Sequence, residues 1–481
     1  MLRCSTGEIL PNIGGHSGAP LSPALLFMTT PTGKPPGKRT SRARRPSSLS
    51  TRGETDRIAS ATNLAALNRL YRFFRDLGPG LITGCADDDP SGISTYAIAG
   101  ASFGYVTLWT ALLSFPLMIG VQVMCSRLAM VTGRGLASVI RLNYPRWVLW
   151  GACLLLLSAN IFNIGADLGG MSEAAAMVTG VSARVWTVFF TALMVSFLFW
   201  SSYRRIARVS KWITLVLLAY VVTAFFAHVD WKDAMLSTLL PRLSWSRDSL
   251  SVLVGILGTT ISPYLFFWQA AQEVEEERAQ GRNIAQRKGA TNAELRRARI
   301  DVITGMFASN FIMYFIILTT AATLHAHGST HIDTARQAAE ALRPLAGAAA
   351  YWLFTLGLIG TGMLGVPVLA GSSAYAIAEA SAWRGSLAKK PRGARRFYSV
   401  LGIAMICGLA TDFAGVDAVR MMFWSAVVNG ALAPPLILLV VLLTSNRRVM
   451  GDRASSWPLR GLGWITFALM TGATIAMLVT S

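Results

Sequence analysis

The sequence predicts an all-α membrane protein with about eleven transmembrane helices. Of its 481 residues, 53% are hydrophobic and 14% are charged, and the mean hydropathy is +0.47. Apolar stretches of about 20 residues, the length that the hydrocarbon core of a bilayer requires, follow one another and leave no room for a large soluble domain. The predicted spans lie near residues 77–101, 104–126, 147–170, 184–201, 210–228, 250–272, 301–324, 349–379, 397–411, 419–444 and 461–480.

The distribution of basic residues predicts how these spans are oriented. The net charge is +20, and 12 of the 44 Lys and Arg residues lie in the first 76 positions. The connections on the same side of the membrane as this segment hold 25 more, whereas the opposite connections hold 7. Because cytoplasmic loops are enriched in Lys and Arg, we expect a cytoplasmic N-terminus and, after eleven crossings, an extracytoplasmic C-terminus in the plasma (inner) membrane. The charge then needs no nucleic-acid partner, and the bilayer is the expected surroundings, with no obligate protein partner evident.

The chain divides by composition into three parts. Residues 1–66 are rich in Pro, Gly, Ser and Arg and are expected to form a disordered basic cytoplasmic tail. A start of translation at Met28 stays open as an alternative. Residues 67–445 form the predicted membrane core, and residues 461–480 add one further helix. The five cysteines show no CxxC spacing, so neither a disulfide framework nor a zinc site is predicted.

The first span is the most informative, because three consecutive acidic residues interrupt its apolar run. Asp87, Asp88 and Asp89 stand directly before Pro90. An aspartate at the centre of a membrane helix costs about 2.5–3.5 kcal/mol, so such residues normally face a polar cavity inside the protein. Pro90 removes a backbone donor and Gly92 weakens the helix, which frees main-chain carbonyls beside the acids. We therefore predict a broken helix with a cation site.

The sixth span carries a second predicted break. It contains Gly258-Thr259-Thr260-Ile261-Ser262-Pro263-Tyr264, with a proline at the middle of the membrane. Five crossings separate the two breaks, and an odd number reverses the topology. The pattern therefore predicts two inverted five-helix repeats, about 77–228 and 250–444, with the substrate bound between the two broken helices. Two ordinary proline kinks are the alternative.

Several motifs near the first break resemble those of the NRAMP divalent-metal transporters. The span count and the proline of the sixth span match as well, over about residues 76–445. The resemblance implies a LeuT-type fold, alternating access and a divalent metal substrate. The matching motifs are Gly78-Pro79-Gly80-Leu81, Asp89-Pro90-Ser91-Gly92, Ala99-Gly100-Ala101-Ser102-Phe103-Gly104-Tyr105 and Leu108-Trp109.

The departures from the family pattern concern the expected ligands. The family motif Asp-Pro-Gly-Asn reads here as Asp89-Pro90-Ser91-Gly92, so the asparagine ligand is replaced by Gly92. The family motif Met-Pro-His reads here as Ser262-Pro263-Tyr264, so the thioether ligand is lost. Thioethers favour soft transition metals, whereas oxygen donors favour Mg²⁺ and Mn²⁺. The pattern is similar to the NRAMP-related magnesium transporter branch, and we expect a Mg²⁺ or Mn²⁺ substrate.

Four residues are the leading metal ligands. Asp89 is the expected charged ligand. The resemblance implies that Ala86 and Thr259 contribute main-chain carbonyls, and Ser262 is expected to bind through its hydroxyl or through a water. Mg²⁺ dehydrates reluctantly and is commonly held by one or two carboxylates, which this set provides.

Further residues are candidate metal ligands, each with a structural or solvated role as the alternative. On a continuous helix, two of the acids point roughly 200° and 100° away from Asp89, so one lines a vestibule or is solvated. The resemblance implies that Asp167 matches an acid of the third helix. Asn429 stands where the family has a glutamine on the tenth helix, with interhelical packing as the alternative, and Gln269 stands where the family has a histidine on the sixth. Glu273 is expected to be a vestibule charge or a solvated helix end. The candidates are Asp87, Asp88, Gly92, Tyr264, Asp167, Asn429 and Gln269.

The histidines bear on proton coupling. All five lie in the tail, at a span end or in the loop after the seventh span. Proton-driven relatives place histidines on the sixth helix, where an imidazole titrates near physiological pH, and this chain has Tyr264 and Gln269 there. We expect no continuous chain of exchangeable groups from the ion site to the cytoplasm, and therefore weak or absent proton coupling.

Three other functions stay open at this stage. A proton-coupled transition-metal importer would share the fold and the site. A carrier of organic substrates would want a free half-helix N-terminus and fewer acids at the first break. An intramembrane aspartyl protease would use Asp89 and Asp167 as a dyad, but the Gly-x-Gly-Asp motif is missing. We expect no enzymatic activity and no cofactor beyond the transported ion.

Overall fold

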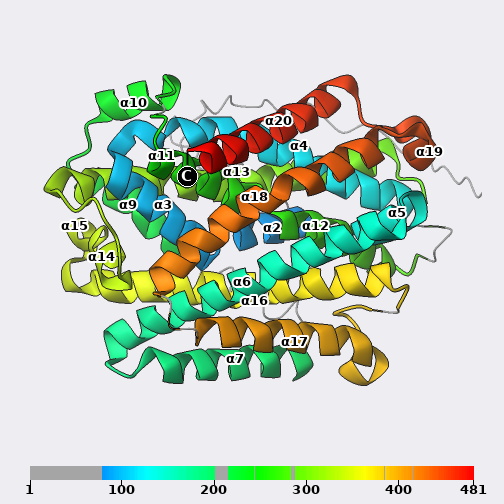
Figure 1. The fold of residues 1–481 in the computed structure, drawn as a ribbon, viewed down its shortest axis with the longest axis horizontal. Coiled ribbons are helices and arrows are strands. Elements are labelled where there is room, and N and C mark those ends of the chain that lie inside the picture. The colour runs from blue at the N-terminus through cyan, green and yellow to red at the C-terminus, as the bar shows by residue number, and fades with distance from the viewer. Residues whose placement is uncertain are drawn as a thin grey trace, which may run out of the picture. The chain divides into compact units, whose positions relative to one another are not determined.

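The computed structural model describes a helical chain from residue 78 onward. All described residues fall in one unit, Tyr71–Ser481, and no strand occurs among them (Figure 1). The predicted tail, residues 1–66, lies outside the described part. The described residues are 78–200, 215–242, 244–282, 286, 288–383, 385–413, 415 and 417–480.

Each predicted span coincides with a helix or with a broken pair of helices. The spans correspond to α2 (Pro79–Asp87) with α3 (Pro90–Phe103), α4 (Trp109–Thr132), α6 (Arg146–Thr179), α7 (Ala183–Trp200), α9 (Leu218–Phe226), α11 (Arg247–Thr260) with α12 (Pro263–Ala279), α13 (Asn292–Thr323), α16 (Ala350–Ala380), α17 (Arg395–Asp412), α18 (Ala418–Ser445) and α20 (Trp457–Val479).

Short elements fill the connections. Short α-helices are α5 (Leu136–Asn143), α10 (Trp231–Leu239), α14 (Ala335–Glu340), α15 (Arg343–Ala346) and α19 (Arg447–Met450). Single 3₁₀ turns are η1 (Gly104–Thr107), η2 (Leu215–Leu217), η3 (His325–His327), η4 (Gly347–Ala349), η5 (Pro391–Gly393) and η6 (Gly451–Arg453).

Length and composition identify eight helical segments in the described part that are able to cross a membrane. α9 is bent by 120° against α10, and this pair raises the number to nine if it forms one span. The α2–α3 pair and α17 coincide with the two other predicted spans, but they are too short, interrupted or charged for the same criterion. The eight segments are Trp109–Thr132, Arg146–Thr179, Ala183–Trp200, Arg247–Ala279, Asn292–His327, Arg343–Ala380, Ala418–Ser445 and Trp457–Val479.

The two predicted helix breaks are present. α2 ends at Asp87 and α3 begins at Pro90, whereas α11 ends at Thr260 and α12 begins at Pro263. Both prolines occupy the first helical position, where the missing N–H is not needed and the fixed φ favours a helix start. Each break therefore leaves the carbonyl end of one half-helix beside the amide end of the next.

Close backbone contacts position the first broken helix. α13 packs against both α2 and α3, and α11 packs against α18. A Cβ atom added at Gly84 would lie 2.2 Å from the carbonyl oxygen of Gly305, and one added at Gly80 would lie 2.6 Å from the amide nitrogen of Val302. Only glycine permits such an approach, so α2 lies with its backbone directly against α13.

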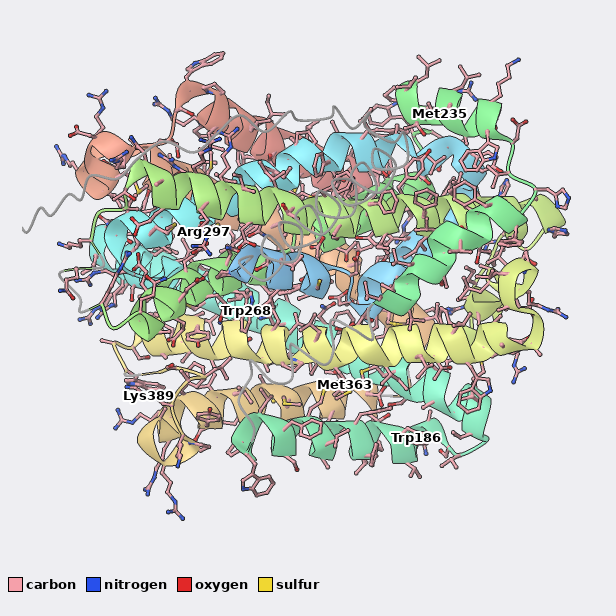
Figure 2. The ribbon with its side chains drawn as sticks, turned by 180° about the vertical axis from the view of Figure 1, so that it is seen from behind. Trp186, Met235, Trp268, Arg297, Met363 and Lys389 are labelled. Atoms are coloured by element: carbon pink, nitrogen blue, oxygen red, sulfur yellow. The ribbon has the colours of Figure 1, made fainter. Side chains whose placement is uncertain are left out.

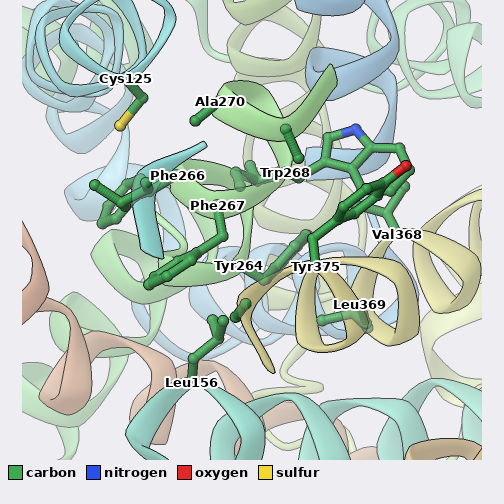
Figure 3. Packing of buried hydrophobic residues seen from close by; sticks show 14 of the residues in the cluster. Cys125, Leu156, Tyr264, Phe266, Phe267, Trp268, Ala270, Val368, Leu369 and Tyr375 are labelled. Carbon is green, nitrogen blue, oxygen red and sulfur yellow. The ribbon is translucent and has the colours of Figure 1, made fainter. Parts of the chain in front are cut away.

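The second broken helix is held by aromatic packing. Phe266, Phe267 and Trp268 of α12 are buried in the main hydrophobic cluster, and Tyr375 of α16 stands beside Trp268 with ring centroids 6.3 Å apart (Figure 3). These large side chains fix the orientation of α12 around its axis.

Basic side chains gather at one end of the helices. Figure 2 shows Arg297 and Lys389 at this end, whereas Trp186 and Met235 lie toward the other. Three helix ends lie on the side of Arg297 and Lys389: the C-terminus of α4 and the N-termini of α13 and α17. This agrees with the order of the predicted loops. The helical arrangement therefore separates the basic and the less basic connections as the charge distribution predicts.

Candidate metal site at the broken helices

Asp89 lies at the first break and is almost fully buried. It forms the N-cap of α3, and its Oδ1 accepts a hydrogen bond from the Gly92 backbone N–H at 2.8 Å. Its Oδ2 accepts one from Asn163 Nδ2 of α6 at 3.1 Å and lies 3.1 Å from the Tyr264 hydroxyl of α12. The carboxylate predicted as the charged ligand thus faces three different helices.

The Tyr264 hydroxyl lies between two of the predicted ligands. It is 3.1 Å from Asp89 Oδ2 and 3.0 Å from the Ala86 carbonyl oxygen. A hydroxyl has one proton and donates to one of these oxygens at a time. A cation that binds between the Ala86 carbonyl oxygen and Asp89 Oδ2 would displace this hydroxyl or bind its oxygen.

The second break repeats this arrangement with a serine. The Ser262 hydroxyl lies 2.6 Å from the Thr259 carbonyl oxygen and 2.9 Å from the Gly258 carbonyl oxygen. Its single proton again serves two acceptors. The two ligands that were predicted from this break, the Thr259 carbonyl and the Ser262 hydroxyl, are thus in contact with each other.

Glycines let backbone approach the acids closely. A Cβ atom at Gly92 would lie 2.8 Å from Thr259 Oγ1 and 3.4 Å from Asp89 Oδ1. A Cβ atom at Gly365 of α16 would lie 3.0 Å from Asp89 Cβ and 3.8 Å from Asp167 Oδ2. A larger residue at either position would fill the space beside the carboxylates, so Gly92 supplies room rather than a side-chain ligand.

Asp167 of α6 lies on the other side of the first break. Its Oδ1 accepts hydrogen bonds from the Ser91 backbone N–H at 3.1 Å and from the Ser91 hydroxyl at 2.5 Å. The hydroxyl of Ser425 in α18 lies 3.1 Å from the Ser91 hydroxyl. Asp167 Oδ2 is buried and has no hydrogen-bond partner among the described residues. One buried oxygen of this carboxylate is therefore left for a ligand.

Asp87 and Asp88 face a different helix from Asp89. The Ser309 hydroxyl of α13 lies 2.6 Å from Asp87 Oδ2 and 3.1 Å from Asp88 Oδ1. Both carboxylates are buried, and Asp87 Oδ1 has no partner within the described part of the chain. The solvated alternative is wrong for both, and the helical angles do not apply because α2 ends at Asp87. The separation of these two acids from Asp89 arises from the break itself.

Gln269 belongs to a chain of hydrogen-bonded polar side chains between α2, α12 and α4. Its Oε1 accepts from the Thr83 hydroxyl at 2.6 Å, and its Nε2 donates to Glu273 Oε1 at 2.9 Å. The Ser126 hydroxyl donates to the same Glu273 oxygen at 2.7 Å. Glu273 is 5% exposed, so the expectation of a solvated helix end is wrong. Among the described residues no hydrogen bond joins this chain to Asp89.

A cavity of about 580 Å³ opens at the end of this chain. Glu273, Asp301 and the N-terminus of α2 contribute to its wall, together with charged residues of α12 and α13. Its lining is Gly78, Pro79, Met130, Glu273, Glu276, Glu277, Gln280, Arg282, Ala293, Glu294, Arg296, Arg297, Ala298, Ile300 and Asp301. Asp89 lies outside this wall, so α2 separates the cavity from the first break.

Asn429 lies one helical turn after Ser425 on α18. It is 2% exposed, and its Oδ1 has no hydrogen-bond partner among residues that the structure describes. Because residues four apart share a helix face, Asn429 faces the same side of α18 as the serine that contacts Ser91. An unpartnered amide oxygen at this position is available to an outer ligand or a water.

The sequence did not identify several residues of this site. Asn163 stands four positions before Asp167 and therefore on the same face of α6, which is a signal that the spacing carries. Ser91 forms part of the matched motif, but the motif does not indicate its contact with Asp167. Ser309 and Ser425 come from distant helices, and no local pattern distinguishes them from other membrane serines.

The charge balance of the site is its main chemical property. Asp87, Asp88, Asp89 and Asp167 are all buried, and no Lys, Arg or His side chain is buried anywhere in the described ranges. No three His, Cys, Asp or Glu side chains of the described residues converge in a ready-made metal cluster. A bound ion would therefore take a mixed set of carboxylate, carbonyl, hydroxyl and amide oxygens, some of them through water.

Comparisons with known proteins identify what the chain is similar to. Residues 80–480 match the family model of natural resistance-associated macrophage protein-like (Nramp) proteins. The divalent metal cation transporter MntH of Klebsiella pneumoniae subsp. pneumoniae is 27% identical over 420 residues, which cover 84% of this chain and 94% of that protein. MntH of Caldanaerobacter subterraneus subsp. tengcongensis is 25% identical over 422 residues, 84% of this chain and 93% of that protein.

A solved structure shows the fold. The Eremococcus coleocola manganese transporter, crystallised with an aromatic bis-isothiourea compound, superposes with a TM-score of 0.65 at 18% identity. The match covers 85% of this chain and 86% of that one. The predicted all-α, LeuT-type fold with two inverted repeats and broken first and sixth helices is thereby confirmed.

Proposed function

Because the chain belongs to the Nramp family, we propose that it carries divalent metal cations across a membrane by alternating access. The MntH relatives named above are divalent metal cation transporters, which supports a transporter rather than an enzyme. The observation that carries the proposal is the set of four buried aspartates at the first helix break, with no buried cationic side chain among the described residues. Uncompensated buried charge is costly, and a divalent cation supplies the missing positive charge.

The geometry of the half-helices favours a cation at the same place. The C-terminal ends of α2 and α11 meet the two breaks, and helix C-termini carry a partial negative charge. Asp89 caps the N-terminus of α3, so the positive end of that half-helix is already neutralised. An organic carboxylate would need a free half-helix N-terminus, and at the first break Asp89 already occupies that position.

We propose Mg²⁺ or Mn²⁺ as the substrate. Ser262 stands where the family has methionine, so the matched position offers a hydroxyl in place of a soft sulfur ligand. Asp89 and Asp167 provide carboxylate charge, while Asn163, Tyr264 and Ser91 provide polar atoms at distances that suit bound waters as well as direct contact. A hydrated Mg²⁺, which keeps several waters, is compatible with such a set.

The proposed ligands follow from the contacts. Asp89 is the charged ligand, and the Ala86 and Thr259 carbonyls become available once the Tyr264 and Ser262 hydroxyls turn away from them. Gly92 keeps the space open. Asp167 and Asn429 offer unpartnered oxygens for an outer shell of water.

The proposed transport has two variants, one without strong proton coupling and one that is coupled to protons. We propose that transport is without strong proton coupling, because Tyr264 and Gln269 replace the imidazoles that the resemblance implies. The alternative, a proton-coupled transition-metal importer, is favoured by one observation: the chain Thr83, Gln269, Glu273 and Ser126 leads to the cavity and contains a buried carboxylate. The two variants differ in whether metal influx brings protons.

We also propose the orientation and location of the protein. The end of the helices that carries most basic residues faces the cytoplasm under the positive-inside rule. The N-terminus is then cytoplasmic and the C-terminus extracytoplasmic, in a plasma (inner) membrane. Protease protection of terminal tags in right-side-out and inverted vesicles measures this directly.

The experiment that tests the function is metal uptake into proteoliposomes. Wild-type protein should take up Mg²⁺ and Mn²⁺, and Asp89→Ala and Asp89→Asn should lose transport by at least about 100-fold while keeping the wild-type melting temperature. Asp333→Asn is the matched control, because Asp333 is an exposed aspartate whose carboxylate lies 3.5 Å from Arg420 on the surface. Near wild-type uptake by folded Asp89→Ala would contradict the assignment of the site.

A further inference from the structure

A second charged cavity lies at the basic end of the helices, away from the metal site. It has a volume of about 290 Å³ and lies between the C-terminal part of α4, the N-terminal part of α13 and the η6 turn before α20. Four arginines and a single acidic residue line it. The lining residues are Arg127, Asn292, Leu295, Arg296, Arg299, Asp452 and Arg453.

The arginines of this cavity repel one another. Arg127 is half-buried, and its charge faces those of Arg453 and Arg299. Its Nη2 donates to the Arg453 carbonyl oxygen at 2.9 Å, whereas its Nε is buried without a hydrogen-bond partner in the described part. Arg453 Nη1 donates to the neutral side chain of Asn292. No ion pair between described residues involves these arginines. Asp452 is the one acidic residue in the wall, so four arginines face a single carboxylate and the cavity keeps an excess of positive charge.

Such a cavity suits a phosphate group. A guanidinium presents a planar fork of donors that matches phosphate oxygens and is more weakly hydrated than an ammonium. Basic pockets between transmembrane helices at the membrane surface are a recurring site for anionic lipid head groups. The cavity stands where α4 leaves and α13 enters the predicted membrane, which is the depth of the head groups.

An exposed apolar stripe begins directly beside the cavity. Arg296, Ile300, Phe307 and Phe311 lie on one face of α13 by their spacing. Ile300 is 41%, Phe307 57% and Phe311 38% exposed. Phe115 of α4 extends the stripe, with its ring centroid 5.9 Å from that of Phe307. A free phosphate ion has no use for this surface, whereas an acyl chain does.

We propose that the arginine cavity binds the phosphate head group of an anionic membrane lipid whose acyl chains lie along the α13 stripe. The occupied cavity would neutralise the repulsion among the four arginines. It would also hold the start of α13, the helix that carries Asp301 and Ser309 and therefore contacts α2 and the first break. Bound lipid should thus stabilise the helix against which the first half-helix packs.

The test uses the purified full-length chain and two lipids of equal acyl composition. Native mass spectrometry measures retention of phosphatidylglycerol and of phosphatidylcholine by the wild type, by Arg127→Gln/Arg299→Gln and by Arg392→Gln/Arg395→Gln. The last variant removes the same charge from exposed positions at the same end of the helices. We expect the first double variant to retain phosphatidylglycerol at least about 10-fold more weakly, and the control variant to match the wild type.

Two further arms keep the proposal falsifiable. Arg299→Gln alone changes an exposed residue, so it reports on the cavity even where the double variant fails to fold, and it should weaken phosphatidylglycerol retention by itself. Phe307→Ser should weaken the lipid but leave the effect of inorganic phosphate on the melting temperature unchanged. Equal loss in the control variant would overturn the proposal in favour of surface charge. Full displacement of the lipid by millimolar inorganic phosphate would overturn it in favour of a free-anion site.

Discussion

Asp301 fastens the first half-helix to α13, and removing its charge should loosen that half-helix. Its Oδ1 accepts hydrogen bonds from the Gly78 N–H at 2.9 Å and the Leu81 N–H at 3.3 Å, and its Oδ2 accepts from the Gly80 N–H at 2.7 Å. These donors belong to the first turn of α2, where backbone N–H groups have no partner inside the helix. One carboxylate of α13 therefore caps the start of α2.

The size of the effect follows from these three bonds. A hydrogen bond to a charged group contributes about 1.5–3 kcal/mol, and a neutral one about half as much. Asp301→Asn keeps one acceptor oxygen, turns the other into a donor that faces an N–H, and removes the charge. We expect a loss of about 2–4 kcal/mol in the attachment of α2, which corresponds to about 30- to 1,000-fold in the equilibrium between the attached and the detached half-helix.

Hydrogen–deuterium exchange of the peptide that covers residues 78–87 measures this change. The peptide should exchange faster in Asp301→Asn, while peptides from α6 and α16 keep the wild-type rate. Asp333→Asn makes the same chemical change at an exposed position and should leave the 78–87 peptide unaffected. Unchanged exchange of this peptide in folded Asp301→Asn would refute the role of Asp301 as the cap of α2.

Three further predictions concern packing, selectivity and coupling. Gly84→Ala should lower the melting temperature, because its Cβ would lie 2.2 Å from the Gly305 carbonyl and overpacking costs about 1–3 kcal/mol; Gly402→Ala, with no other atom within 4 Å of the added Cβ, should not. Ser262→Met should raise Cd²⁺ uptake relative to Mg²⁺ in a competition assay, and tight Cd²⁺ binding by the wild type would contradict the hard-ion proposal. Mn²⁺ influx into liposomes with an internal pH indicator should bring no stoichiometric acidification between about pH 6 and 8; acidification that disappears in Asp167→Asn would show proton coupling.

Local features of the sequence predict the framework of this protein well. Hydropathy identifies most spans because each stretch must cross the same apolar thickness, whereas the α2–α3 pair and α17 do not meet the length and composition criterion. Pro90 and Pro263 predict the two breaks together with the polar and small residues beside them, because proline removes a bond from the helix ladder. Proline alone does not decide a break, since α4, α16 and α18 continue through Pro116, Pro367, Pro434 and Pro435. Asp89 follows from the cost of an unpaired charge at membrane depth. In each case the cause lies within a few residues of the effect.

The remaining features depend on contacts between distant segments. The position of Ser309 opposite Asp87 and Asp88 requires the packing of α13 against α2, which is set by the glycine contacts between the two backbones. Helical angles misplaced these two acids because they assume a helix that continues past Asp87. Glu273 looked solvated from its acidic neighbours, but Ser126 and Gln269 hold it inside the protein.

The hydroxyls of Tyr264 and Ser262 connect the structure to the expected substrate. Each stands between two oxygen acceptors and donates its one proton to one of them at a time, although Asp89 Oδ2 also accepts from Asn163 Nδ2. An ion that sheds its waters and binds between these oxygens displaces the hydroxyls from the Ala86 and Thr259 carbonyls or binds the hydroxyl oxygens. A hydrated ion instead brings water protons that reach the remaining acceptors while the hydroxyls stay in place. We therefore expect the site to accept an ion that keeps its waters, which is the behaviour of Mg²⁺, one of the two proposed substrates.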